Sequence, residues 1–566
     1  MTTHDNGLTR RSFIGLGAVL AAGATAGLAG CAPRSREAGL APGGGSTGAA
    51  ASADWLGEEP ALGSVARTEE CDLLIVGAGT AGLAAAATAA DLGLDFILCE
   101  KTGTVQETRE YFGAVDSPYQ QAMQIAIDKP KLLNELTRYA SGKCNQEVLK
   151  VWIDESGETV AWFDALMQEA TGKPCVVDVT PEHATGGTDY YLPTLQHVWL
   201  TPYEPPTRND VFAAHIEQAG RPARFNWTMT RLIHEGGKVT GALFDTDEGT
   251  VQVNAKNTLL ATGGYPANPA MMEALSPATL AVCTASSFAP ANTGEGIKAG
   301  LWAGASKDRE SATMIFDRGA VAPGVTCGYV GEGDARMLPG TIFQENIGSQ
   351  PFMKVNLHGK RFVNESMPYD FLCNAAGQQP GGVWCQVFDA NASDDILRFD
   401  TIGCSAFAKQ MMAVGMPVEE FCAASAEQGI LKKADTLEDL ADQLGFEGAD
   451  KESFLAQIER YNAQFDAQID DDFGKEAYRL SAIRQAPFYG CWFGGTLLTT
   501  IDGLTINKHC QVLDGDGEVI EGLFAAGDCS GSFFSGNYPE YLVGVACGRS
   551  TTQGRHVARY LAGEIS

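Results

Sequence analysis

The segment from Cys71 to Glu100 constrains the fold more than any other part of the chain. It opens with an apolar run, Cys71–Val76, of the kind that forms a buried strand, and continues into Gly-Ala-Gly-Thr-Ala-Gly at 77–82. An alanine-rich helix is predicted over Leu83–Leu92 and a second strand over Phe96–Cys99, directly before Glu100. This order of strand, glycine-rich turn, helix, strand and acid is typical of a βαβ unit that binds a dinucleotide.

Each residue of this unit has a chemical reason for its place. Gly77 makes the tight turn, Gly79 lets the backbone approach a pyrophosphate, and Gly82 allows the helix to pack closely on the strand. The helix N-terminus supplies amide donors and the positive end of a dipole for the phosphates. Glu100 would accept hydrogen bonds from ribose hydroxyls, which favours an unphosphorylated ribose. Packing alone is the alternative explanation for the glycines.

Two later segments distinguish a flavin from a nicotinamide dinucleotide. Residues 257–264 form a predicted strand that runs into Thr-Gly-Gly, and residues 522–528 form another that ends at Asp528. Both resemble motifs of flavoproteins of the glutathione-reductase type, in which the final aspartate meets the ribityl or pyrophosphate groups. The resemblance implies FAD as the cofactor. The residues predicted to bind it are Gly77, Ala78, Gly79, Thr80, Ala81, Gly82, Glu100, Lys101, Thr262, Gly263, Gly527, Asp528 and Val545.

Further markers are Thr293–Ile297, Gly304-Ala305, Gly359–Glu365 and a terminal helix through Gly554-Arg555. The ordered set resembles the fumarate reductase/succinate dehydrogenase flavoprotein family, which includes soluble fumarate reductases and 3-ketosteroid dehydrogenases. It implies an α/β fold, with a Rossmann-like FAD-binding domain of glutathione-reductase type split by an inserted α+β capping domain. In that family a hydride passes between flavin N5 and one carbon of a carbon–carbon bond, while a side chain handles the proton at the other.

The chain departs from the family where a dicarboxylate would be held. The arginine that donates the proton in fumarate reductases corresponds to Tyr369, and a second carboxylate-binding arginine, in the helix after the Ala-Gly-Asp strand, to Tyr541. The two expected histidines correspond to Ile315 or Phe316 and to Thr499. Two buried carboxylates need fixed positive charge, because an unpaired buried anion is costly. We therefore expect a larger, flatter and mostly apolar substrate with a carbonyl or phenol group, and not fumarate.

A tyrosine with its ordinary pKa of about 10 is protonated at neutral pH and can donate that proton. Donation suits the reduction of an activated C=C bond, such as that of an enone or enoate. Glu365 has lost its arginine partner on this alignment, and Glu540, at a predicted helix start, would complement the helix dipole. The alternative for the tyrosines is ordinary core packing. The predicted catalytic residues are Tyr369, Tyr541, Tyr538 and Glu365.

The N-terminus has the features of an export signal. Thr9–Ile14 carries a twin-arginine pattern, and the apolar run after it ends at Leu28-Ala29-Gly30-Cys31. This ending resembles a bacterial lipoprotein box, which would leave Cys31 as an acylated N-terminus and the lipid as the sole membrane attachment. We expect an exported protein, anchored to the outer face of the cytoplasmic membrane. An N-terminal membrane helix is the alternative.

These features divide the chain into five predicted parts. They are a signal at 1–31, a flexible tether at 32–70, the first part of the FAD-binding domain at 71–305, the capping domain at 306–485 and the second part of the FAD-binding domain at 486–566. The tether is rich in glycine, alanine, serine and proline, which is typical of a flexible linker.

Composition limits the partners. The net charge of −30 repels phosphates and argues against nucleic acid. The 15 cysteines are scattered singly, so no metal, iron–sulfur or c-type haem site is predicted. The chain also resembles the flavin subunit of a respiratory reductase, and this resemblance implies an external electron donor, a cytochrome or flavin protein linked to the quinone pool. His183 and His197, near Tyr190-Tyr191, are possible pocket histidines, although a lone histidine is more often structural.

The leading interpretation is an exported FAD-dependent reductase that uses a small organic molecule as electron acceptor in anaerobic respiration. An enzymatic alternative is a dehydrogenase that desaturates a ketosteroid-like compound. A non-enzymatic alternative is a lipoprotein that binds a metabolite and keeps FAD only structurally.

Overall fold

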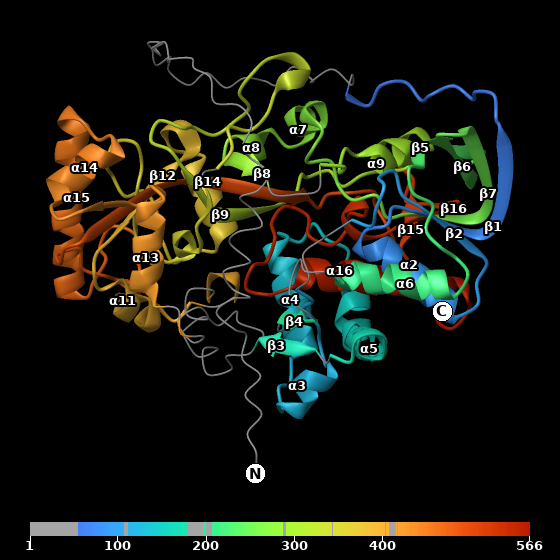
Figure 1. Ribbon diagram of the computed structural model, residues 1–566, viewed down its shortest axis with the longest axis horizontal. Helices are drawn as coiled ribbons and strands as arrows, with labels where there is room; N and C mark the ends of the chain where they lie inside the picture. The colour runs from blue at the N-terminus through green and yellow to red at the C-terminus, as the bar shows by residue number, and fades with distance from the viewer. Residues whose placement is uncertain are drawn as a thin grey trace.

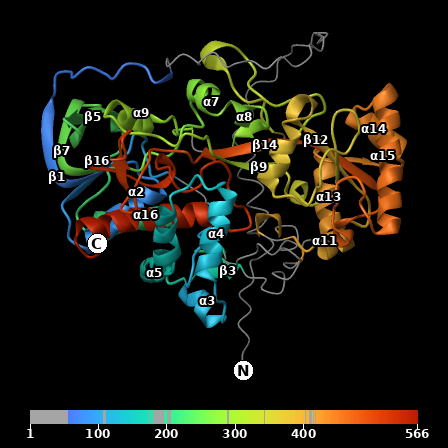
Figure 2. The same cartoon turned by 180° about the vertical axis from the view of Figure 1, so that it is seen from behind.

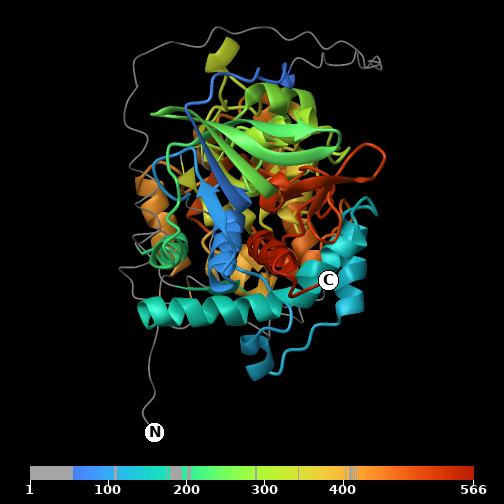
Figure 3. The same cartoon turned by 90° about the vertical axis from the view of Figure 1, so that its right-hand side faces the viewer.

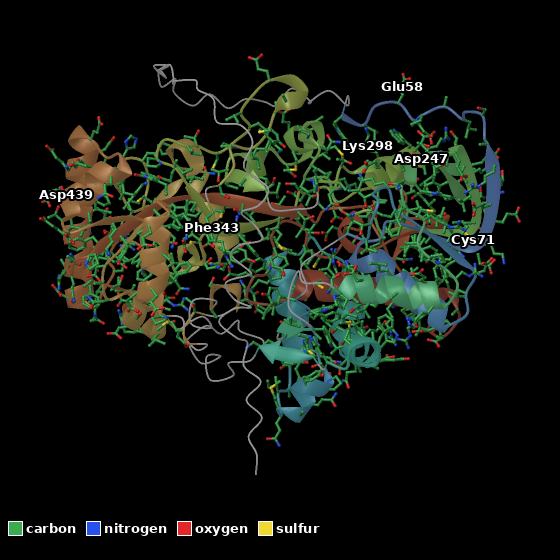
Figure 4. All side chains as sticks on the ribbon, in the orientation of Figure 1. Glu58, Cys71, Asp247, Lys298, Phe343 and Asp439 are labelled. Carbon is green, nitrogen blue, oxygen red and sulfur yellow. The ribbon has the colours of Figure 1, made fainter. Side chains whose placement is uncertain are left out.

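Two seven-stranded sheets lie end to end along the long axis of the molecule (Figure 1). Cys71, in the first sheet, and Asp439, on a helix beside the second, lie at opposite ends of that axis (Figure 4). This arrangement is seen in a computed structural model, which describes residues 55–106, 111–173, 175–178, 194, 196–199, 206–286, 290–341, 343–401, 403–406, 412, 415 and 417–566.

The first sheet has a parallel core with antiparallel additions. Its strands are β1 (Arg67–Val76), β2 (Phe96–Cys99), β5 (Thr228–Glu235), β6 (Lys238–Thr246), β7 (Gly249–Leu260), β15 (Gln511–Leu513) and β16 (Val519–Ala525). The parallel pairs are β2–β1, β1–β7, β7–β16 and β16–β6, while β5, β6 and the first part of β7 form an antiparallel meander. The last four residues of β1 are buried, which explains their unbroken apolar run. β1 begins inside the range predicted as tether, because Arg67–Glu70 pair with β7.

Helices α2 (Thr80–Asp91), α6 (Arg208–Gln218) and α16 (Val545–Leu561) lie below this sheet in Figure 1. The long helix α5 (Gln146–Thr171) lies below them, and α4 (Lys129–Tyr139) and α3 (Pro118–Ala122) lie toward the middle of the molecule. Figure 3 shows α2 and α16 between the sheet and the long helix α5. α2 begins three residues before the predicted helix start, directly after Gly79. α7 (Pro269–Leu275), α8 (Pro277–Leu280) and α9 (Glu295–Trp302) lie on the other side, and β3 (Val176–Asp178) pairs with β4 (Gln196–Val198).

The second sheet is built around β14 (Phe488–Thr500), whose 13 residues are all buried. Its other strands are β8 (Cys283–Ser286), β9 (Thr313–Val321), β10 (Phe343–Gln344), β11 (Met353–Val355), β12 (Trp384–Phe388) and β13 (Lys432–Ala434). The helices are α10 (Tyr369–Ala376), α11 (Ala392–Phe399), α13 (Val418–Glu427), α14 (Leu437–Leu444) and α15 (Gly448–Ala467). α14 and α15 form the outer end of the molecule (Figure 2). β8 and β14 lie outside the range 306–485 predicted for the capping domain.

The predicted signal and most of the predicted tether lie outside the described residues. Within the described part of the chain, none of the helices is both long enough and apolar enough to cross a membrane. The cysteines described there carry free thiols, and most of them are buried.

Candidate active site

The glycine-rich turn between β1 and α2 leaves space at one position only. Gly77 has φ +104°, and a Cβ there would lie 2.4 Å from the Ala261 carbonyl oxygen. A Cβ at Gly82 would lie 1.9 Å from the Gly77 oxygen. At Gly79, by contrast, a Cβ would meet no atom within 4 Å. Gly77 and Gly82 are therefore required by packing, and Gly79 opens the start of α2 to a ligand, as a pyrophosphate site needs.

Glu100 lies beside this turn. Its carboxylate accepts hydrogen bonds from the backbone amides of Ala78, at 2.8 Å, and Thr102, at 3.0 Å. The carboxylate is thus fixed at the end of β2, next to the glycine-rich segment 77–82, where it could accept hydrogen bonds from a pair of ribose hydroxyls. The ammonium group of Lys101, the next residue, binds Thr293 at 2.9 Å and Glu295 at 2.6 Å. The predicted cofactor role of Lys101 stays a prediction.

Asp528 lies across the parallel sheet from the fingerprint, just after β16. It accepts hydrogen bonds from Arg549, at 2.6 Å, and Thr499, at 3.0 Å. Burial raises the pKa of Asp528, and the arginine opposes that rise. Thr499, aligned above with a substrate histidine, therefore supports the predicted cofactor aspartate. The nearby Thr262 hydroxyl donates to the sulfur of Cys529 at 3.3 Å.

The start of α16 is held against this region by close backbone contacts. Val545 is the first residue of α16, and Gly544 before it has φ +72°, where a Cβ would lie 2.3 Å from the Gly113 nitrogen. Further along, a Cβ at Gly554 would lie 2.1 Å from the Ala81 oxygen, so α16 and α2 pack without side chains between them. The amides of both helix starts, the Glu100 carboxylate and Asp528 together fit the parts of an FAD molecule. These groups would hold the cofactor.

The two predicted tyrosines lie in one buried aromatic region. Tyr369 is the first residue of α10 and is 1% exposed, and its ring meets the edge of Phe316 with centroids 5.1 Å apart. Tyr541 is 6% exposed and makes a similar contact with Tyr139 at 5.5 Å. Tyr541 precedes α16 and is not in it, contrary to our alignment. Glu540 joins the two, because its carboxylate accepts a 2.8 Å hydrogen bond from the Tyr369 amide.

Acidic groups gather around these tyrosines. Burial raises the pKa of Glu540 well above its usual value, and Asp317 and Asp370 add to the effect. Burial also raises the pKa of Asp370 to about 7. One Asp370 oxygen accepts a 2.8 Å hydrogen bond from the Tyr139 hydroxyl, and the other is buried with no partner among the described residues. We name Asp317, Asp370 and Glu540 the acid cluster. Asp370 and Glu540 therefore keep a proton to higher pH than exposed carboxyls do.

Glu365 has a partner, which corrects our expectation that it had lost one. Arg361 binds its carboxylate through two 2.8 Å hydrogen bonds and also binds Asp470. Lys475 lies 3.3 Å from Glu365, and all four side chains are fully buried. Burial alone would raise the pKa of Glu365, but Lys475 and Arg361 hold it below its usual value. We name these four residues the paired cluster. Its bonds support a structural role for Glu365, whose catalytic role stays a prediction.

A cation lies close to the tyrosines, at a position that our alignment did not single out. Arg318 on β9 is 7% exposed, and its guanidinium lies 4.4 Å above the ring of Phe316. It also donates a 3.2 Å hydrogen bond to Asn346. Tyr538 lies on the α16 side, with its ring 5.4 Å from Phe534. The structure therefore brings Tyr369, Tyr541 and Arg318 into one region.

His197 is a structural histidine. It is fully buried, donates to the Phe112 carbonyl at 2.8 Å and accepts from the Ser117 hydroxyl at 2.8 Å. Burial lowers its pKa to about 4, so it is neutral at pH 7. His183 and Tyr190-Tyr191 lie outside the described residues. Within the described part of the chain, no group of three metal-binding side chains comes together.

Sequence reasoning missed Arg318, Asp370, Tyr139 and Arg549. None belongs to a motif with a diagnostic spacing. The one available signal was an arginine or aspartate inside an otherwise apolar predicted segment, since such a residue needs a partner when it is buried.

Relatives match nearly the full length of the described chain. A vinyl phenol reductase of Lactiplantibacillus plantarum is 28% identical over 523 residues, covering 88% of this chain and 98% of its own length. An NADH:fumarate oxidoreductase of Klebsiella pneumoniae is 24% identical over 84% of this chain, which spans only 46% of that protein.

The fold matches solved flavoproteins as well. The 3-ketosteroid-Δ4-(5α)-dehydrogenase of Rhodococcus jostii RHA1, solved with 4-androstene-3,17-dione, superposes with a TM-score of 0.64 at 19% identity, over 87% of this chain and 97% of that one. The predicted fold class, the FAD cofactor and the oxidoreductase class are thereby confirmed. The family model for the FAD binding domain matches residues 72–541. The chain therefore belongs to that family, as a flavin oxidoreductase related to vinyl phenol reductase, fumarate and acrylate reductases and ketosteroid dehydrogenases.

Proposed function

We propose that the protein reduces the activated C=C bond of a flat organic acceptor, with a tyrosine as the proton donor. The observation that carries this proposal is the meeting of Tyr369 and Tyr541 around Glu540, although Tyr369 and Glu540 are 171 positions apart in the chain. Two phenols beside a proton-retaining acid cluster suit a reaction that consumes a proton. Bound, reduced FAD would supply the hydride.

The side chains would have two roles, which are to hold the acceptor and to protonate it. Either Tyr369 or Tyr541 protonates the α-carbon, while the other holds a carbonyl or phenol oxygen. Phe316 and Tyr139 provide apolar ring surfaces for a flat substrate. Arg318 provides one positive charge, which suits a single carboxylate better than the two of fumarate. We therefore infer that the acceptor is an aryl-substituted alkene with at most one carboxylate.

The relatives support this class of acceptor. A vinyl phenol reductase acts on an aromatic ring that carries a C=C bond, and this chain covers 98% of its length. We further propose export by the N-terminal signal, attachment through a lipid at Cys31, and an external electron donor. These three proposals rest on the sequence patterns at 9–31 and on the absence of any cluster of metal ligands among the described residues.

Anaerobic dye reoxidation tests the proposal. The purified protein is reduced with a viologen and offered fumarate, cinnamates, a vinyl phenol and a steroid enone. We expect turnover with a cinnamate or a vinyl phenol and none with fumarate. Turnover with fumarate would contradict the inferred role of the single cation. Oxidised enzyme that desaturates the steroid while no alkene is reduced would instead establish the dehydrogenase direction.

A further inference from the structure

The chain between η9 (Gly527–Cys529) and α16 bends through a residue in an unusual backbone conformation. We name residues 530–544 the tyrosine segment, because they include Tyr538 and Tyr541. Ser532 in this segment is 5% exposed and has φ +67°, in the left-handed region that residues other than glycine rarely occupy. A serine stays in this conformation only where its surroundings hold it there.

Three separate parts of the chain hold Ser532. Its backbone amide donates to both carboxylate oxygens of Asp308, at 2.9 Å each. Its hydroxyl accepts a hydrogen bond from the Ile506 amide at 3.1 Å. Its carbonyl accepts one from the amide of Asn145, the N-cap of α5, at 2.7 Å. The amide, hydroxyl and carbonyl of Ser532 therefore each have a partner that is distant in the sequence.

Asp308 is the one of these partners that acts through its side chain, since Ile506 and Asn145 act through their backbone amides. Its carboxylate also lies directly against Gly531, where a Cβ would come within 2.5 Å of it. Burial raises the pKa of Asp308 to about 6, and the hydrogen bond from Ser532 opposes that rise. Asp308 is therefore an anion at pH 7, with both oxygens available as acceptors.

Aromatic contacts link Ser532 to the tyrosines. Phe534, two residues further on, lies against Tyr538 with ring centroids 5.4 Å apart. The guanidinium of Arg549 lies 4.9 Å from the centre of the Phe534 ring and also binds Asp528 at 2.6 Å. The direction in which the chain leaves Ser532 therefore determines where this ring, and the tyrosines after it, are placed.

We propose that Asp308 is a positioning residue for the tyrosines, because it holds Ser532 in the left-handed conformation that directs the tyrosine segment into the active site. A displacement of about 1 Å at a reacting group can slow a reaction about 100-fold, so the loss of Asp308 slows turnover without removing a reacting group. The part of the proposal that concerns turnover rests on the proposed function. The part that concerns the conformation of the segment does not.

The first test measures the segment without any acceptor. Backbone hydrogen–deuterium exchange is followed in holoprotein of the wild type, Asp308→Ala and Asp389→Ala. We expect peptides from 530–544 to exchange at least about tenfold faster in Asp308→Ala and at the wild-type rate in Asp389→Ala. Asp389 is the matched control, because it also accepts two backbone hydrogen bonds, from Arg484 at 2.8 Å and Gln485 at 2.9 Å, outside the tyrosine segment. Unchanged exchange in Asp308→Ala would overturn the proposal.

The second test measures kcat per bound FAD with an acceptor that the wild type reduces. We expect Asp308→Ala to lower it about 10- to 100-fold, and Asp308→Asn, which keeps one acceptor oxygen, to lower it less. Adding Ser532→Gly to Asp308→Ala should restore kcat at least about threefold, because glycine adopts a positive φ without the carboxylate. Ser532→Ala should not restore it. A general loss of packing around Asp308 would not be relieved by the glycine.

An unchanged kcat in Asp308→Ala, or a loss that Ser532→Gly does not relieve, would overturn the role of Asp308 in turnover. If Asp308→Ala does not fold, both measurements are made on Asp308→Asn with and without Ser532→Gly, and the same outcomes decide. If the wild type reduces no alkene, the proposed function fails, and the exchange of 530–544 still decides whether Asp308 holds the segment.

Discussion

The two buried charge clusters of the second half of the molecule differ in how many cations accompany their carboxylates. In the paired cluster, Arg361 and Lys475 face Glu365 and Asp470, so two cations meet two carboxylates, all hydrogen-bonded. In the acid cluster, Asp317, Asp370 and Glu540 lie near two cations. Arg318 has its guanidinium over an aromatic ring, and the buried Lys354 interacts with both Asp317 and Glu365. One cluster lowers the pKa of its glutamate, and the other raises it.

We propose that this difference separates a structural cluster from one that takes part in the reaction. A balanced buried network is stable in a single protonation state, so its loss affects folding. An unbalanced one changes protonation state near neutral pH, and that property suits the proton supply of a reaction. The tyrosines proposed to act lie beside the unbalanced cluster.

Removing the tyrosine hydroxyls should have the largest effect. Tyr369→Phe or Tyr541→Phe, whichever is the proton donor, is expected to lower kcat for the best acceptor about 100- to 10,000-fold, because the general acid is lost. Steady-state dye reoxidation measures this. Tyr461→Phe is the matched control, since Tyr461 is equally buried but accepts its hydrogen bond from Lys475 of the paired cluster. Comparable kcat losses in all three variants would remove the distinction between the clusters.

Breaking the paired cluster should affect stability and leave chemistry intact. Arg361→Met leaves Glu365 and Asp470 buried without their main cation, which typically costs about 3–5 kcal/mol of unfolding free energy. Chemical denaturation of the holoprotein measures this loss. Arg460→Met, which removes an exposed arginine bound to Asp472 on the neighbouring surface, is expected to change the midpoint little. A kcat loss per folded molecule as large as that of the tyrosine variants would show that the paired cluster is also reactive.

The acid cluster should make stability depend on pH. The pKa of Asp370 is raised to about 7 in the folded protein from an ordinary value near 4, so the folded state binds the extra proton between these values. Stability is therefore lost as pH rises from about 4 to 7, with Asp317, Glu540 and Tyr139 facing the group. Asp370→Asn should reduce this loss, seen as a difference of several degrees in melting temperature between pH 5 and pH 8. An unchanged pH dependence would mean that Asp370 is ionised throughout.

The smallest effect is expected at the cation. Arg318→Gln should raise the KM for a cinnamate about tenfold and leave the KM for a vinyl phenol nearly unchanged, because only the former has a carboxylate. A rise for both substrates would indicate that Arg318 shapes the site and does not select the charge.

The first part of the cofactor site could be predicted because the residues that form it are close together in the sequence. From Gly77 to Glu100, turn, helix and acid follow each other along the chain, and backbone geometry fixes them locally. The tyrosine region is assembled from β9, α4, α10 and the turn before α16, so motif alignment found Tyr369 and Tyr541 but not Arg318 or Asp370. The partner of Glu365 was also missed, although it is close to Glu365 in the chain. Arg361 lies only four positions away, but an alignment that looked for the arginine after the glutamate passed over one before it.

The pairing order of the first sheet has a consequence for the synthesis of the protein. β1 pairs with β7, and β7 in turn pairs with β16, which begins only at Val519. A nascent chain that has left the ribosome as far as Thr500 still lacks Asp528 and α16, and so has only one edge of the cofactor site. Contacts between such distant segments form late and slowly. FAD can therefore be enclosed only after β16 and α16 have been made and have left the ribosome, and free flavin must be present in the compartment where they fold onto β7.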